Sequence, residues 1–130
     1  MSIINLLSVE MEKRLIFNSR DELVRIDVSK IVYFEADGNY TYIVTCNKIK
    51  SAICMNLGQM EEMLAEQLKE RKSIFARIGK RYIVNLSFVY KIHPQKRQLA
   101  LTDFSNFLYQ IPISTEALKK LKDIMVEIKY

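Results

Sequence analysis

The sequence predicts a mainly β domain with two short helices, one central and one C-terminal. Short runs rich in β-branched and aromatic residues recur along the 130 residues and are separated by turn residues. Only two segments, after Asn56 and after Pro112, carry apolar residues at helical spacing. Glycine (3) and proline (2) are scarce, and no repeat or linker interrupts the chain. We therefore expect one continuous domain at residues 13–130, after an N-terminal extension at residues 1–12.

The first part of this domain is expected to form strands joined in hairpins. A polar turn at residues 18–22 separates the first two apolar runs. Asp37-Gly38-Asn39 is a strong hairpin signal between the next two, and Asn47-Lys48 is a further turn. The strands predicted here cover residues 15–17, 23–28, 31–36, 40–45 and 49–54.

The central helix has a clear start signal. Asn56 can cap it, and Gln59, three residues later, can complete a capping box. The residues at helical spacing that should face the core are Leu57, Met60, Leu64 and Leu68.

Beyond this helix the β pattern returns and then gives way to the last helix. Turns are expected at residues 93–97 and 103–106, and Ser114 can cap the final helix. The predicted strands cover residues 74–78, 82–84, 88–92, 98–102 and 107–111. The apolar stripe of the final helix should consist of Ala117, Leu118, Leu121, Ile124 or Met125, and Ile128.

The cysteines and the apolar runs indicate a cytoplasmic protein without membrane insertion. With a turn at residues 47–48, Cys54 falls opposite Thr41, too far from Cys46 to form a disulfide. We expect two reduced, partly buried thiols. The apolar runs are too short to cross a membrane, and the N-terminus lacks the features of a secretory signal.

No catalytic or metal-binding pattern is present in the sequence. His93 is the only histidine, and it precedes a proline in a basic turn, which favours a loop position. There is no glycine-rich phosphate loop, no metal-ligand spacing and no G-x-S-x-G motif. We therefore expect no enzyme activity, no cofactor and no metal, although carboxylates distant in sequence could still meet in space.

Basic residues are concentrated in one third of the chain. The formal net charge is +5, but residues 69–97 contain nine basic residues and one acid, so they carry +8 and the remainder carries −3. Gly79-Lys80-Arg81 lies in the middle of this segment and interrupts two apolar runs. It is either an ordinary surface turn or a loop that meets a negatively charged partner. Charge alone does not choose between DNA, RNA and an anionic membrane surface.

Three motifs resemble the LytTR family of bacterial DNA-binding domains. They are IVYFEADGNY at residues 31–40, FARIGKRYIVNL at residues 75–86 and IPIS at residues 111–114. The match extends from about Leu15 to Leu121. The resemblance implies an elongated antiparallel β sandwich of small sheets, as in the output domains of two-component response regulators. It also implies control of transcription by sequence-specific binding to direct repeats in promoter DNA, with loops entering successive major grooves.

The resemblance assigns DNA contacts to three regions: the turn after the aromatic-Glu pair, the loop at residues 79–81, and the start of the last helix. Lys80 and Arg81 are suited to phosphates, and an arginine can also bind guanine O6 and N7. The nine residues carried over are Asn39, Tyr40, Thr41, Gly79, Lys80, Arg81, Thr115, Glu116 and Lys119.

Three positions depart from the family pattern. Gly79 and Arg81 stand where many relatives have histidine and serine, so the base preference of those relatives does not carry over. Glu116 stands where relatives often have a basic residue. The Glu116 carboxylate either interacts favourably with the helix dipole, accepts a hydrogen bond from cytosine N4, or marks a DNA contact that this chain has lost. We further expect Arg77 to pair with Glu35, and Asn85 to bond local backbone.

The family usually places a receiver domain ahead of this one, and only about a dozen residues precede the first predicted strand. We expect either a free-standing regulator or a separate sensor or receiver partner, with a homodimer on DNA also open. Ile3, Ile4, Leu6 and Leu7 are expected to add an edge strand or a dimer contact. The main alternative is a protein-interaction module of the same fold that pairs with another regulator without reading DNA. An RNA-binding β domain would need paired stacking aromatics, which are not seen.

Overall fold

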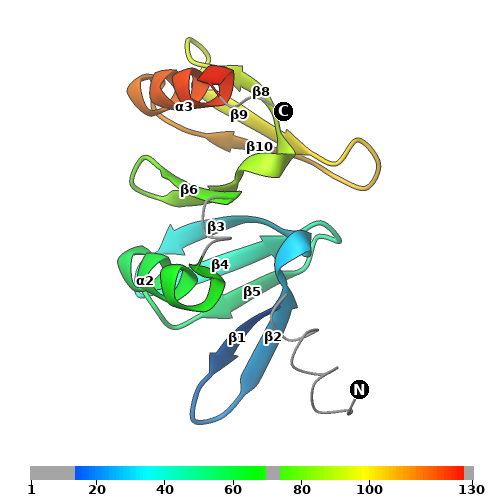
Figure 1. Ribbon diagram of the computed structural model, residues 1–130, viewed down its shortest axis with the longest axis vertical. Helices are drawn as coiled ribbons and strands as arrows, with labels where there is room; N and C mark the ends of the chain where they lie inside the picture. The colour runs from blue at the N-terminus through cyan, green and yellow to red at the C-terminus, as the bar shows by residue number, and fades with distance from the viewer. Residues whose placement is uncertain (1–13, 70–73, 128–130) are drawn as a thin grey trace.

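The computed structural model describes residues 14–69 and 74–127. The protein is elongated, with three antiparallel sheets following one another along its long axis and two helices beside them (Figure 1). The expectation of a mainly β fold built from small sheets is therefore confirmed. The expected N-terminal extension, with its apolar residues Ile3 to Leu7, lies outside the described residues.

The central sheet has five strands in the order β5-β4-β3-β7-β6, and a smaller sheet packs against each of its two faces. The central strands are β3 (Ile31–Asp37), β4 (Tyr40–Thr45), β5 (Lys50–Ile53), β6 (Phe75–Ile78) and β7 (Tyr82–Asn85). The outer sheets are β1 (Arg14–Asn18) with β2 (Leu23–Asp27), and β8 (Val89–His93), β9 (Gln98–Thr102) and β10 (Leu108–Pro112). The helices are α2 (Leu57–Leu68) and α3 (Thr115–Glu127), with short 3-10 turns at Val28–Lys30 and Leu86–Phe88.

The central sheet is covered on both faces, and each face belongs to a separate hydrophobic core. On one face Phe34 and Ile83 pack in a cluster with α2 and the β1-β2 hairpin. On the other face Tyr33 and Val84 pack with the three-stranded sheet and α3. Because both faces are buried, β3 and β7 read as nearly continuous apolar runs rather than as alternating ones.

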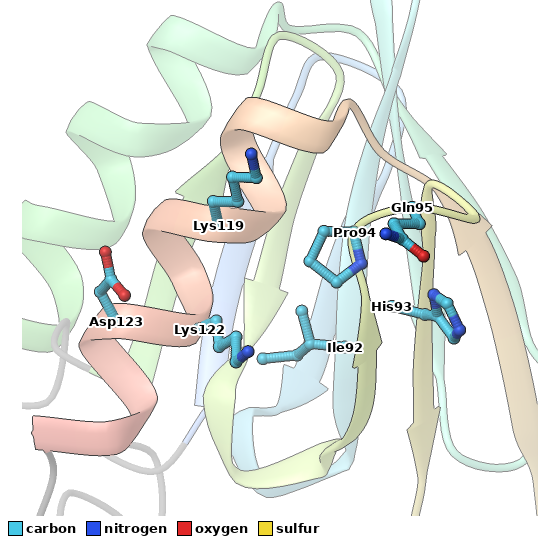
Figure 2. A pocket seen from close by; sticks show the side chains of 7 residues that line it. All are labelled: Ile92, His93, Pro94, Gln95, Lys119, Lys122 and Asp123. Carbon is cyan, nitrogen blue, oxygen red and sulfur yellow. The ribbon is translucent and has the colours of Figure 1, made fainter.

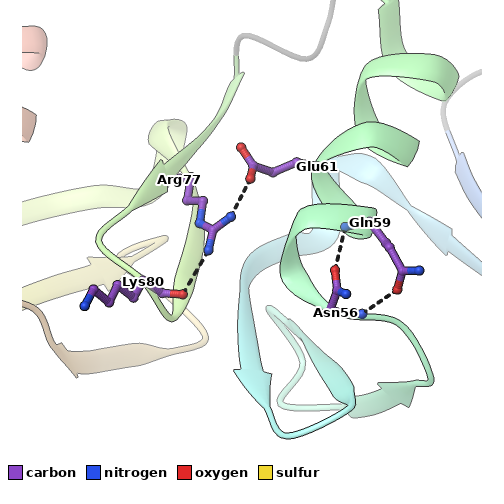
Figure 3. A network of polar contacts seen from close by, with 5 residues as sticks. All are labelled: Asn56, Gln59, Glu61, Arg77 and Lys80. Carbon is purple, nitrogen blue, oxygen red and sulfur yellow. Dashed lines mark hydrogen bonds and ion pairs between the residues drawn. The ribbon is translucent and has the colours of Figure 1, made fainter.

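Both helices begin as the sequence predicts. The Asn56 side chain accepts from Gln59 N, and the Gln59 side chain accepts from Asn56 N, so the capping box is present (Figure 3). All four residues of the predicted α2 stripe are buried. In α3, Ser114 Oγ accepts from Ala117 N at 3.3 Å.

The apolar stripe of α3 follows the prediction within the described residues, and the structure chooses between the two alternatives at its end. Leu118 and Leu121 are fully buried, and Met125 is partly buried against the core. Ile124 is 46% exposed, so Met125 rather than Ile124 continues the stripe. Ile128 lies outside the described residues.

The cysteine prediction needs two corrections. Thr41 pairs with Ile53, so the predicted register between β4 and β5 was wrong by one residue. Cys54 therefore follows the last paired residue of β5 and is exposed, whereas a partly buried thiol was predicted. Cys46 is partly buried, and both thiols are free.

Candidate nucleic-acid interface

Two of the predicted contact regions lie at the same end of the central sheet. β3 pairs antiparallel with β7, and Glu35 lies opposite Tyr82. The end of β3 therefore lies beside the start of β7, which brings the turn at 38–39 next to the turn at 79–81. Ala36 N donates to Arg81 O at 2.8 Å and joins the two hairpins at this point.

The third region joins them through α3. A cleft of about 790 Å³ is lined by residues 77–82 on one side and by the β10–α3 junction with the first turns of α3 on the other. A Cβ built on Gly79 would lie 3.8 Å from Ala117 Cβ, so the turn comes close to the helix. In Figure 1, β3, the β6-β7 hairpin and the start of α3 all point to the same long side of the molecule.

The turn at 94–97 also belongs to this side, although no contact was predicted for it from the sequence. Thr115 Oγ1 donates to Pro94 O at 3.0 Å, and Ile113 N donates to Arg97 O at 3.1 Å. These bonds hold the exposed Lys96 and Arg97 beside the start of α3. The concentration of charge in residues 69–97 was the sequence signal that could have identified them.

Figure 2 shows the neighbouring hollow between this turn and α3. Ile92, Pro94 and Gln95 line one wall, and Lys119 and Lys122 line the other. Lys119, one of the predicted contacts, is exposed there. Lys120, which was not predicted, lines the adjoining cleft beside residues 77–82. The start of α3 therefore adds lysines to the same cationic side.

Arg77 braces the 79–81 turn from the α2 side. Its guanidinium pairs with Glu61 at 2.6 Å and donates to Lys80 O at 3.2 Å (Figure 3). The predicted pair of Arg77 with Glu35 is wrong. Arg77 lies opposite Ile83, which packs on the α2 face, whereas Glu35 lies opposite Tyr82 on the other face. Paired residues share a face of the sheet, so Arg77 and Glu35 point to opposite faces.

Arg81 takes the place that was predicted for Arg77. Its Nη2 lies 3.0 Å from Glu35 Oε2. The Arg81 side chain is 59% exposed, whereas that of Glu35 is 20% exposed, so the arginine lies outside and the acid inside. Lys80 is exposed and makes no ion pair within the described part of the chain. The turn thus presents one free cation and one anchored cation to solvent.

The first region contributes less than expected. Asn39 and Tyr40 are exposed, and Tyr40 is 48% exposed. Thr41 is fully buried, and its hydroxyl donates to Met55 O at 2.8 Å. Its cross-strand partners Ala36 and Ile53 both pack in the α2-side core, which fixes its inward direction. The Thr41 side chain is therefore not exposed on this surface, and its contact with DNA stays a prediction.

Two further polar residues have clear positions. Glu116 lies exposed in the first turn of α3, where a carboxylate is favourable to the helix dipole. Asn85 is buried, and its Oδ1 accepts from Ser87 N at 3.0 Å, which confirms the predicted local bond. Its Nδ2 also donates to Ile31 O at 2.8 Å, so Asn85 links β7 to the start of β3 as well.

Two tyrosines, Tyr33 and Tyr82, lie in the strands next to the 79–81 turn. Burial raises the pKa of Tyr82 and raises the pKa of Tyr33 to about 12. The two rings meet edge to face, with centroids 6.0 Å apart. Both phenols are therefore neutral at physiological pH and add no charge to this end of the sheet.

Among residues 14–69 and 74–127, no group of three or more histidine, cysteine, aspartate or glutamate side chains is placed to hold a metal ion. No helix in the same ranges is long and apolar enough to cross a membrane.

Comparisons with known proteins agree with this geometry. A search of curated proteins finds no match. A solved LytTr DNA-binding domain from Bacillus cereus is similar in fold, with a TM-score of 0.62 and 20% sequence identity. The similarity covers 87% of this chain and 96% of that one. The family model for the LytTr DNA-binding domain matches residues 21–126. The chain therefore belongs to the LytTR family of DNA-binding domains.

Proposed function

We propose that the chain is a transcriptional regulator that binds promoter DNA sequence-specifically at direct repeats. The observation that carries this proposal is the 79–81 turn, a braced and outward-facing cationic turn beside the start of α3. The turn at 38–40 lies at the same end of the sheet, so several loops can approach one duplex together. Their arrangement along one side of an elongated molecule suits contact with successive grooves (Figure 1).

The side chains divide into those that supply affinity and those that supply selection. Lys80, Lys96, Arg97 and Lys119 are exposed cations that can neutralise phosphates and release counterions. Arg81 has a planar guanidinium that can donate two hydrogen bonds to one guanine. Phosphate contacts position a protein on DNA, and contacts to base edges specify the sequence.

Three finer features belong to this proposal. Asn39, Tyr40, Glu116 and the partly buried Thr115 lie close enough to these loops to make additional contacts with DNA. Two copies would occupy the two repeats. A sensor or receiver, on this chain or on a separate one, would supply the signal.

The competing function is a protein-interaction module that does not read DNA. Two observations favour it: Glu116 is an acid in the first turn of α3, and Arg81 is already paired with Glu35. The second observation is the stronger, because a paired arginine is partly neutralised. The exposure of the Arg81 side chain and the free Lys80 weigh against this function.

A selection from a pool of random duplexes with the purified protein separates the two functions. The regulator proposal expects enrichment of a short repeated sequence. It also expects binding to weaken with salt by about 0.9 log units per tenfold salt for each phosphate neutralised. If the protein retained duplexes in a salt-sensitive way without preference for any sequence, or retained none, the result would instead support the interaction module.

A further inference from the structure

Glu35 is a carboxylate that directly follows a buried apolar stretch of the chain. It lies in β3, where the four preceding residues, 31–34, are all buried. Its side chain is 20% exposed and contacts Arg81, which extends from the start of the neighbouring strand. A partly buried acid beside a proposed DNA-contacting arginine needs a physical explanation, because a carboxylate repels phosphates.

The geometry around Arg81 fixes both its backbone and its side chain to β3. Arg81 O accepts from Ala36 N at 2.8 Å, and Arg81 Nη2 donates to the adjacent Glu35 at 3.0 Å. The guanidinium carbon also lies 5.7 Å from the centre of the Tyr82 ring. Only one of the five guanidinium N–H groups is used within the described part of the chain, so the others remain available.

We propose that Glu35 is a positioning residue that orients the Arg81 guanidinium toward a guanine edge and so determines sequence specificity. The inference rests on the proposed function. An arginine held by a carboxylate loses less rotamer freedom when it binds a base, because its fork is already oriented. The same carboxylate lowers attraction to phosphates in general, so Glu35 weakens non-specific binding while it supports the specific contact.

The test compares two probes: the best duplex recovered with wild-type protein from a random pool, and a random-sequence duplex of the same length. The ratio of the two affinities is measured for wild type, E35A, E35Q, R81K and the E35A/R81K double variant. E62A is the matched control, since Glu62 is an exposed α2 carboxylate that makes no ion pair with Arg81. Circular dichroism establishes that each variant is folded.

The inference expects E35A to lower the ratio by about tenfold, within the range of about 5- to 150-fold that one bidentate base contact supplies. Binding of E35A to the random duplex should be unchanged or tighter. E35Q should keep most of the ratio, because its amide oxygen can still accept from Arg81. E62A should leave the ratio unchanged, and E35A/R81K should be no less selective than R81K alone.

Two results would overturn the inference while leaving the proposed function intact. One is a change of the same size in the affinities of E35A for the selected and the random duplex. That result would mean that Glu35 only lowers the positive charge of the DNA-binding surface. The other concerns E35A/R81K. If its affinity ratio fell by the product of the factors measured for E35A and R81K, the two effects would be independent, and Glu35 would not act through Arg81. A wild-type protein that binds both probes equally would overturn the proposed function itself, and this inference with it.

Discussion

The turn at Gly38-Asn39 and the turn at residues 79–81 use the same backbone device at the same end of the central sheet. Each contains a glycine with a positive φ, 60° at Gly38 and 72° at Gly79. Their surroundings differ. A Cβ on Gly38 would meet nothing within 4 Å, whereas one on Gly79 would touch Ala117 of α3.

The side chains at the two turns differ more than their backbones do. The 79–81 turn carries two cations, and it is held by Arg77 from the α2 side and by Glu35 from β3. The 38–39 turn is followed by Tyr40, which is exposed, and by Thr41, which belongs to the core. The residues of a short segment are thus enough to predict a turn. Whether the side chains of that turn are exposed and held in place for a partner depends on residues that are distant in the sequence.

The largest effect is expected from removing both cations of the 79–81 turn. Lys80→Ala together with Arg81→Ala should weaken binding to the selected duplex by about 100-fold or more, because a phosphate contact and a base contact are lost together. Electrophoretic mobility shift or fluorescence anisotropy measures the affinity, and thermal unfolding should remain cooperative.

Lys30→Ala with Lys48→Ala is the matched control for that change. Both lysines are exposed and lie at the opposite end of the central sheet, beside the start of β3 and the end of β4. This variant loses the same formal charge and should bind nearly as well as wild type. Equal losses in the two double variants would show that total charge, not the 79–81 turn, determines binding.

The two glycines provide a second, smaller contrast. Gly38→Ala and Gly79→Ala should each lower the free energy of unfolding by about 1–2 kcal/mol, because L residues are strained at positive φ. Gly79→Ala should also reduce selective DNA binding, and by more than Gly38→Ala does, since relaxation of its turn moves Lys80 and Arg81. Denaturant unfolding and anisotropy separate the two effects. If Gly38→Ala impaired DNA binding to the same degree, the distinction between the turns would fail.

Thr41→Val tests whether Thr41 contributes to the stability of the core or to DNA binding. The change removes the hydroxyl that donates to Met55 O and should cost about 1 kcal/mol of unfolding free energy. The folded variant should bind the selected duplex as wild type does, because Thr41 is fully buried. A specific loss of DNA affinity without a loss of stability would support Thr41 as a contact.

The smallest effect is expected at the α2 brace. Arg77 and Glu61 are both substantially exposed, so solvent weakens their ion pair. Arg77→Ala should therefore reduce stability by less than about 1 kcal/mol, measured by urea unfolding. It should still reduce selectivity for the chosen duplex measurably, since the bond to Lys80 O is lost as well. An unchanged selectivity would show that the turn keeps its shape without Arg77.

Hairpins and helix caps could be predicted from the sequence because their signals are local. Asp37-Gly38-Asn39 forms a turn, and Asn56 with Gln59 forms a capping box, without reference to the rest of the chain. The direction of a side chain in a central strand depends on pairing register, which the sequence does not state. For that reason the partner of Arg77 was predicted wrongly and Thr41 was placed at the surface.

In the candidate site, too, local features could be predicted from the sequence and contacts between distant segments could not. The Lys80-Arg81 pair could be found from charge and motif, since both lie in one short segment. The basic segment at residues 69–97 also contains Lys96 and Arg97. Their position beside α3 could not be predicted, because it depends on bonds from Ile113 to Arg97 and from Thr115 to Pro94. Such contacts join segments far apart in sequence and become visible only in the folded chain.

The most direct test of the central claim is amide chemical-shift mapping of the wild-type protein as the selected duplex is added. The 79–81 turn is expected to meet DNA together with the 94–97 turn and the start of α3. The largest changes should therefore fall at residues 79–81, 94–97 and 115–119. The turn at 103–106, at the opposite end of the β9 strand, should stay unchanged. Changes centred on residues 103–106 with none at 79–81 would contradict the account.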